Sequence, residues 1–103
     1  MKKVYLSFPI NNYNLQERRS FAERREKALS NFYEVVNPLK NGLPPTAHWR
    51  THMRRDFKLL LDCDVIYMCE GWESSAGCKL EFDVATTCGI EVMYEKDKWK
   101  LDR

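Results

Sequence analysis

Residues 65–88 read VIYMCEGWESSAGCKLEFDVATTC, and this stretch decides the fold. Its first five residues are apolar without the alternation of a half-exposed strand, which is typical of a strand covered on both faces. A loop follows at residues 71–75, and residues 76–88 then show the apolar spacing of a helix that ends at Gly89. The side chains expected to face inward from this helix are Leu80, Val84, Ala85 and Cys88.

The rest of the chain repeats this alternation of strand and helix. Further strands are expected at residues 3–8, 33–36 and 90–94, with helices at 16–31 and 49–61 and a loop at 41–48. The expected apolar faces are Phe21, Ala22, Ala28, Leu29 and Phe32 in the first helix, and Trp49, Met53, Phe57, Leu60 and Leu61 in the second.

This alternation indicates a parallel sheet with right-handed crossovers. We predict one domain over residues 1–103, a small Rossmann-like α/β three-layer sandwich with a four- or five-stranded sheet in the order 2-1-3-4. The charged tail at residues 95–103 is either loose or supplies the fifth strand. In such a sheet a ligand binds at the carboxyl ends of the strands, where the strand order reverses. The loops at residues 8–14 and 70–75 are therefore expected to hold the site.

The composition excludes several classes of protein. The chain has 103 residues, 44% of them hydrophobic, and no apolar run near the roughly 18 residues that a membrane span needs. Its first residues lack the apolar core of a secretory signal, and its four cysteines form no C-x-x-C pair. These features favour a cytoplasmic protein with reduced, mostly buried thiols. The net charge is only +2, and glutamates interrupt the arginines at residues 16–27, so a nucleic acid polymer is not expected as a partner.

The sequence also lacks the usual signatures of cofactor binding. Neither G-x-G-x-x-G nor G-x-x-x-x-G-K-[ST] occurs, which disfavours a dinucleotide or triphosphate enzyme of the usual kind. His48 and His52 are four residues apart, but no cysteine or glutamate ligand stands beside them. We therefore predict no metal site and no organic cofactor.

The strongest functional signal lies between residues 70 and 81. Ser74 or Ser75 is a natural N-cap for the following helix, whose first amides attract an anion such as phosphate. Gly77 in the first turn costs up to ~1 kcal/mol of helix stability compared with alanine, which suggests a close approach to the backbone. Glu81 lies on the face that should be apolar. It is therefore either part of a structural ion pair or a nucleophile or base that points into a pocket.

Asp56, in the middle of the helix at residues 49–61, is a second acidic candidate. Asp64 is expected instead to cap or anchor the turn before the third strand. Two carboxylates that converge on one pocket suit glycosidic chemistry, because one can attack the anomeric carbon while the other protonates the leaving group.

Three segments together carry a resemblance to a known family. They are VYLSFPI at residues 4–10, MRRD at 53–56 leading to DVI at 64–66, and GWESSAG at 71–77 leading to Glu81. In this order and spacing, the chain resembles the nucleoside 2-deoxyribosyltransferase superfamily, which includes the 2′-deoxynucleoside 5′-phosphate N-hydrolases. It looks closest to a small bacterial and phage branch of largely unassigned function, and the resemblance covers nearly the whole chain.

The resemblance implies roles for individual residues. Glu81 matches the family's catalytic glutamate, which attacks the deoxyribose anomeric carbon, and Tyr5 matches a tyrosine that supports it. Asp56 matches an aspartate that protonates or orients the base. Ser75 stands where transferases acting on free nucleosides carry an aspartate and phosphate-handling hydrolases carry a serine, which favours a nucleoside monophosphate. Phe8 replaces the usual glycine, and its ring would narrow the pocket or stack on a base.

The remaining candidates for substrate binding lie in the two loops and at the start of the first helix. They are Ser7, Pro9, Asn11, Gly71 and Trp72, while Arg18 and Arg19 would either meet a phosphate or be solvated. Asn11 either binds ligand hydroxyls or serves the turn. Trp72 either stacks on the ligand or lies in a contact between subunits.

We therefore predict a cytoplasmic homodimer or higher homo-oligomer that cleaves or transfers the N-glycosidic bond of a 2′-deoxynucleoside 5′-monophosphate. Members of the resembling family often complete their sites with a neighbouring subunit. The alternative hypothesis is a non-catalytic nucleotide-binding or sensing module with the same pocket. A third hypothesis is a structural assembly protein with a relict pocket. Whether Glu81 is needed for turnover, or only for folding and binding, separates the first two.

Overall fold

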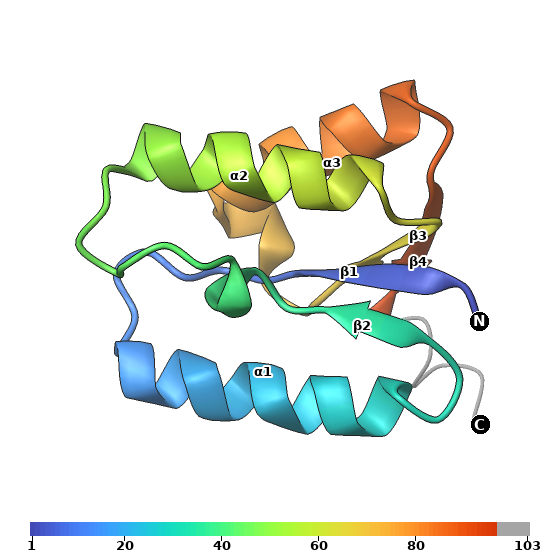
Figure 1. Cartoon of the computed structure of the whole chain (residues 1–103), viewed down its shortest axis with the longest axis horizontal. Helices are drawn as coiled ribbons and strands as arrows, with labels where there is room; N and C mark the ends of the chain where they lie inside the picture. Colours follow the sequence, from blue (N-terminus) through green and yellow to red (C-terminus); the bar gives the residue numbers. More distant parts are fainter. Residues whose placement is uncertain (97–103) are drawn as a thin grey trace.

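A computed structural model describes residues 1–96 of the chain as strands alternating with helices (Figure 1). The elements are β1 (Lys3–Ser7), α1 (Leu15–Leu29), β2 (Glu34–Val36), η1 (Pro38–Lys40), α2 (Trp49–Leu61), β3 (Val65–Met68), η2 (Trp72–Ser74), α3 (Ala76–Thr87) and β4 (Glu91–Tyr94), where η marks a 3-10 helix. The strands and helices expected from the sequence are confirmed, with bounds that differ by at most two residues.

The four strands form a parallel sheet in the order β2-β1-β3-β4, as the sequence predicted. In the register of the central strands, Tyr5 lies opposite Val36 of β2 and Ile66 of β3. Figure 1 shows α1 covering one face of the sheet, with α2 and α3 side by side on the other. The strand order reverses between β1 and β3, so the loops that follow these two strands begin at the same edge of the sheet.

Alternation along β1 divides the core between the two faces of the sheet. Val4 and Leu6 belong to the cluster under α1, together with Ala22 and Leu29 of that helix. Tyr5 belongs to the opposite cluster, together with buried residues of α2 and α3. Odd-numbered residues of β1 therefore point toward α2 and α3, which places the hydroxyl groups of this strand beneath those helices.

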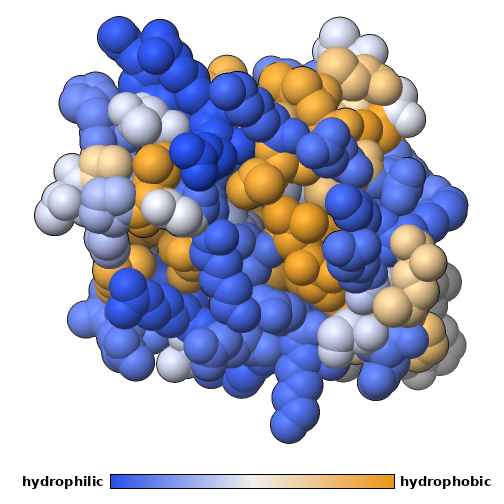
Figure 2. Space-filling model, viewed as in Figure 1, coloured by the Kyte–Doolittle hydropathy of each residue, from blue (hydrophilic) through white to orange (hydrophobic). Residues whose placement is uncertain are grey.

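Several apolar side chains that the sequence placed inward lie at the surface. Leu61 is 52% exposed, Leu80 43% and Phe32 68%, and Ala28 and Cys88 are exposed as well. Each helix buries only the stripe that faces the sheet or its neighbour, so apolar residues at the edge of that stripe stay in contact with water. Phe32 lies beyond the last residue of α1 and therefore belongs to no helix face. Figure 2 shows such apolar side chains among charged ones on the side where α2 and α3 lie.

The sequence predicts that Arg18 is either solvated or in contact with a phosphate, but in the structure its side chain is buried. Its guanidinium lies 4.6 Å from the ring centre of Tyr13 and 4.3 Å from that of Phe21. It also pairs with Glu17 and donates a 3.1 Å hydrogen bond to the carbonyl of Pro9. These contacts tie the loop after β1 to the first turns of α1.

The start of the charged tail is also part of the packed structure. Glu95 is 3% exposed, and its carboxylate accepts a 2.9 Å hydrogen bond from Arg25 and a 3.1 Å bond from the backbone N–H of Glu70. The remainder of the tail, residues 97–103, on which the alternatives of a loose segment or a fifth strand depend, lies outside the described residues. Within residues 1–96, no helix is long and apolar enough to cross a membrane.

Candidate active site

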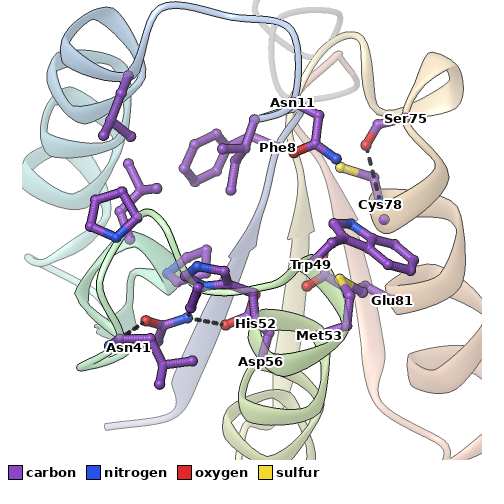
Figure 3. Close-up of a pocket in the computed structure, with 18 of the residues that line it drawn as sticks. Phe8, Asn11, Asn41, Trp49, His52, Met53, Asp56, Ser75, Cys78 and Glu81 are labelled. Carbon is purple, nitrogen blue, oxygen red and sulfur yellow. Dashed lines mark hydrogen bonds between the residues drawn. The ribbon is translucent and has the colours of Figure 1, made fainter.

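A pocket of about 330 Å³ lies at the carboxyl end of β1, bounded by the loop after that strand, residues 41–48, α2 and the start of α3 (Figure 3). Its acidic lining residues are Asp56 and Glu81. The other lining residues are Phe8, Ile10, Asn11, Leu15, Arg19, Pro38, Leu39, Asn41, Leu43, Pro45, Ala47, Trp49, His52, Met53, Ser75, Gly77 and Cys78. Mostly apolar walls with a few polar groups are typical of a site for a small organic molecule.

Glu81 projects from α3 toward the sheet and is only 6% exposed. Its two carboxylate oxygens accept hydrogen bonds from β1, one from the Tyr5 hydroxyl at 2.5 Å and the other from the Ser7 hydroxyl at 2.9 Å. Tyr5 and Ser7 can act together because residues two apart on a strand share a face. Glu81 therefore takes no part in an ion pair within residues 1–96, and its partners are neutral hydroxyl groups.

The surroundings of Glu81 shift its acidity. Burial raises the pKa of Glu81 to about 7, and the nearby charge of Asp56 acts in the same direction, although the two hydroxyl donors oppose the rise. Burial and the charge of Glu81 likewise raise the pKa of Tyr5 well above its ordinary range, so Tyr5 remains a donor. A carboxylate of this kind ionises near neutral pH and can serve as a nucleophile or a base.

Asp56 reaches the same pocket from α2 and is also 6% exposed. Its Oδ1 atom accepts a 2.9 Å hydrogen bond from the side-chain amide of Asn41. Burial raises the pKa of Asp56, and the bond from Asn41 partly offsets that rise. Asp56 and Glu81, the two carboxyl groups on which the prediction of glycosidic chemistry rests, therefore line the same pocket.

Asn41 is held in place by a set of hydrogen bonds that the sequence did not reveal. Its side-chain oxygen accepts from the N–H of Leu43 at 3.0 Å, and its amide nitrogen lies 3.1 Å from Nδ1 of His52. Nε2 of His52 lies 3.1 Å from the carbonyl oxygen of Pro44. Because a carbonyl oxygen can only accept a hydrogen bond, Nε2 carries the ring hydrogen and Nδ1 is the acceptor for Asn41. Figure 3 shows Asn41 and His52 beside Asp56 at one side of the pocket.

The start of α3 forms the opposite wall. Ser75 is the N-cap, and its hydroxyl accepts a 3.3 Å hydrogen bond from the N–H of Cys78. A Cβ at Gly77 would lie 3.6 Å from the sulfur of Met53 and would stand at the pocket wall. Burial raises the pKa of the Cys78 thiol, which keeps that thiol protonated at neutral pH.

Phe8 is 3% exposed and lines the pocket while its ring packs 5.5 Å from the ring of Phe21. Most of its surface is therefore used in the core under α1. Asn11 and Arg19 line the mouth of the same pocket and are exposed.

Five predicted site residues do not line this pocket. Tyr5 and Ser7 are fully buried with their hydroxyls on Glu81, so Ser7 supports that carboxylate and does not bind substrate directly, and the other three residues, Pro9, Gly71 and Trp72, lie in the loops. The Trp72 ring stacks on Phe82 at 4.8 Å, and Trp72 and Gly71 line a separate hollow beyond the end of β3. Gly71 has a φ of 91°, so the backbone conformation accounts for the glycine there without a ligand. The Pro9 carbonyl is taken up by Arg18. These three residues shape the loops around the pocket rather than its wall.

Sequence reasoning missed Asn41, His52 and Trp49 as lining residues. His52 stands four residues before Asp56 on α2, a spacing that places both on one helix face and could have revealed it. Asn41 gave no such signal, because an asparagine in a loop rich in glycine and proline already has a role in the turn. In residues 1–96, no group of three or more histidine, cysteine, aspartate or glutamate side chains is placed to hold a metal ion.

Comparisons with known proteins agree with this architecture. A family model described as "Domain of unknown function (DUF4406)" matches residues 2–94. No curated protein matches the sequence. A 2-deoxyribosyltransferase from Leishmania mexicana has a similar structure, with a TM-score of 0.68 and 14% sequence identity over 91% of this chain and 63% of that one. A conserved protein from Enterococcus faecalis V583 is similar with a TM-score of 0.68 and 20% identity, over 99% of this chain and 73% of that one.

These likenesses show a fold in common. The chain has the parallel α/β architecture of a deoxyribosyltransferase-like protein, and it spans 63% of the length of the Leishmania enzyme.

Proposed function

For this chain, which belongs to the DUF4406 family, we propose cleavage or transfer of the N-glycosidic bond of a 2′-deoxynucleoside 5′-monophosphate. Glu81 is the nucleophile in this proposal. The observation that carries it is a buried carboxylate at a pocket wall, held by two hydroxyl donors and without a cationic partner in the described part of the chain. A structural ion pair would need a cation at this place, whereas a nucleophile needs lone pairs that remain available, and a carboxylate with two acceptor bonds still has them.

The proposed reaction uses the two carboxyl groups in opposite protonation states. An oxygen of ionised Glu81 attacks the anomeric carbon, the bond to the base breaks, and the electron pair of that bond passes to the base nitrogen. Asp56 donates its proton to the departing base and becomes a carboxylate. The negative charge of Asp56 raises the pKa of Glu81, so the two groups are coupled, and the proposed step uses the form of the pair in which the shared proton lies on Asp56 and Glu81 is ionised.

The second half of the reaction regenerates both groups. A water molecule attacks the anomeric carbon, its proton passes to Asp56, and Glu81 leaves as a carboxylate. If a second base takes the place of water, the outcome is transfer instead of hydrolysis. In this proposal the acceptor decides between hydrolysis and transfer.

The phosphate is assigned to the mouth of the pocket near the start of α3. Ser75 and the first amides of this helix supply hydrogen-bond donors and the positive end of the helix dipole. Arg19 lines the same pocket from α1 and adds a positive charge. The apolar walls at Phe8 and Leu39 then suit the faces of a base.

The test is chromatography of free base released from a panel of deoxy- and ribonucleoside monophosphates, with and without an acceptor base. Glu81→Gln keeps the size of the side chain and is expected to abolish release. Glu95→Gln is the matched control, because Glu95 is also a buried carboxylate but bonds to Arg25 outside the pocket. It is expected to lower stability and to keep turnover per folded molecule.

The outcomes separate the proposal from its alternative. Release from deoxynucleotides that is lost in folded Glu81→Gln and kept in Glu95→Gln supports the proposal and identifies the base. No release from any substrate, together with a thermal shift in the presence of one nucleotide, contradicts the enzymatic role and leaves a nucleotide-binding module.

A further inference from the structure

Asn41 holds Asp56 through an amide group whose hydrogen-bonding capacity is committed elsewhere in the protein. One amide hydrogen goes to Oδ1 of Asp56 at 2.9 Å and the other to Nδ1 of His52 at 3.1 Å, while the oxygen accepts from Leu43. The backbone carbonyl of Asn41 also accepts a 2.7 Å hydrogen bond from Arg55. An amide has only two hydrogens to donate, so Asn41 has none left for a ligand although it lines the pocket.

The orientation of this amide is fixed by its neighbours. A flipped amide would turn its nitrogen toward the N–H of Leu43, and two donors would then face each other. It would also point its oxygen at the Asp56 carboxyl, which repels it in the ionised state. His52 adds a second constraint, because its ring is itself held by the carbonyl of Pro44.

This arrangement leaves the two oxygens of Asp56 in different situations. Oδ1 is bound by Asn41, whereas Oδ2 has no hydrogen-bond partner within residues 1–96. In the same part of the structure no buried side-chain nitrogen or oxygen lacks a partner, so Oδ2 is open to the pocket.

We propose that Asn41, locked by His52, is a positioning residue that binds Oδ1 of Asp56 and thereby makes Oδ2 the atom that delivers the proton to the substrate. The role rests on the proposed function. When Asp56 gives up its proton, the amide of Asn41 stabilises the carboxylate that forms, because a hydrogen bond to a charged acceptor is stronger than one to a neutral acceptor. Asn41 thus makes a buried aspartate a more effective acid.

The charged and titratable groups around Asp56 come from three elements. His52 and Arg55 lie on its own helix, Glu81 faces it from α3, and Tyr5 faces it from β1. Asn41→Ala alters none of these side chains, and the carbonyl of Pro44 still holds the His52 ring. A change in the titration of Asp56 then reports the loss of the amide itself.

The experiment compares Asn41→Ala with Asn37→Ala. Asn37 is equally buried and accepts from the backbone two residues ahead in the same way, but it donates to Glu26 and not to Asp56. The carboxyl carbon of Asp56 is titrated by ¹³C NMR, with Asp56→Asn to assign its signal. The rate of base release is measured on the same variants.

Asn41→Ala is expected to raise the pKa of Asp56 and to lower kcat on the order of 10- to 100-fold, the effect of one hydrogen bond to a charged group. KM should change little, because Asn41 has no donor to offer the substrate. Asn37→Ala should lower the melting temperature without moving either quantity. His52→Leu removes the acceptor of the second amide hydrogen and should change both quantities in the direction of Asn41→Ala.

An unchanged Asp56 titration in Asn41→Ala overturns the proposal, as does an equal effect of Asn37→Ala. If the wild-type protein releases no base, the proposed function fails. The NMR titration still decides whether Asn41 controls Asp56, so the two failures are distinguishable.

Discussion

Replacing Glu81 by glutamine should make the protein more stable at neutral and alkaline pH while removing its proposed activity. The side chain of Glu81 is buried, and its pKa is raised from 4.5 to about 7. A carboxyl group with a raised pKa in the folded state favours folding most when it is protonated. Its contribution is therefore fully present below the unfolded pKa and is lost as the pH rises through the folded pKa. Glutamine has the same shape and no charge to bury.

The size of the effect follows from the two pKa values. A folded-state pKa of about 7 against 4.5 corresponds to about 3 kcal/mol of lost stability once Glu81 is fully ionised. At about pH 4 both states are mostly protonated, and the loss is only a few tenths of a kcal/mol. The difference in unfolding free energy between Glu81→Gln and wild type should therefore grow by about 3 kcal/mol between about pH 4 and pH 8.

The assay is urea unfolding followed by circular dichroism at a series of pH values in that interval. Glu73→Gln is the control, because Glu73 is an exposed carboxylate on η2. Its effect should stay within about 0.5 kcal/mol at every pH. A difference between Glu81→Gln and wild type that does not depend on pH would refute the reasoning. So would a variant that is less stable than wild type at alkaline pH, since the hydroxyl donors would then outweigh burial.

Three further predictions concern the neighbours of this site. Tyr5→Phe removes a hydrogen-bond donor to ionised Glu81, so the acidic limb of the pH–rate profile should move to higher pH and kcat should fall by about 10-fold or more. An unshifted profile contradicts the role of this donor. Gly77→Ala should gain up to ~1 kcal/mol in urea unfolding from helix propensity while KM rises, because the new methyl group stands at the pocket wall; an unchanged KM means that no ligand approaches this backbone. Glu95→Ala leaves Arg25 without its partner and should cost about 3 kcal/mol in the same unfolding assay; a loss below about 1 kcal/mol would show that solvent replaces the pair.

The strands and helices could be predicted because their patterns are local. The apolar run at β3 and the helical spacing of α3 need no knowledge of the rest of the chain, and alternation of the two element types restricts the sheet to parallel pairing. The same local rule failed for Leu61 and Leu80. Periodicity identifies an apolar face, but the width of the buried stripe depends on where the neighbouring helix lies.

Glu81 could be singled out for a similar reason. A carboxylate at a position where the helix pattern calls for an apolar residue implies a cavity or a partner, whichever fold surrounds it. Trp72 shows the limit of such reasoning. Its place in a loop at the carboxyl edge of the sheet left ligand stacking and a subunit contact as alternatives, but its ring stacks on Phe82 of α3.

The sequence by itself determined the order of elements, the edge of the sheet where the loops meet, and the acidic residues that stand out from their patterns, because each depends on neighbours within a few positions along the chain. Only the tertiary structure decided which partners these residues have. The hydroxyls of Tyr5 and Ser7 reach Glu81 across more than 70 residues of sequence, and Asn41 reaches Asp56 from a separate loop. The pKa of a buried carboxyl group depends on burial and on donors brought together by packing, so its chemistry is settled only when the helices close over the sheet.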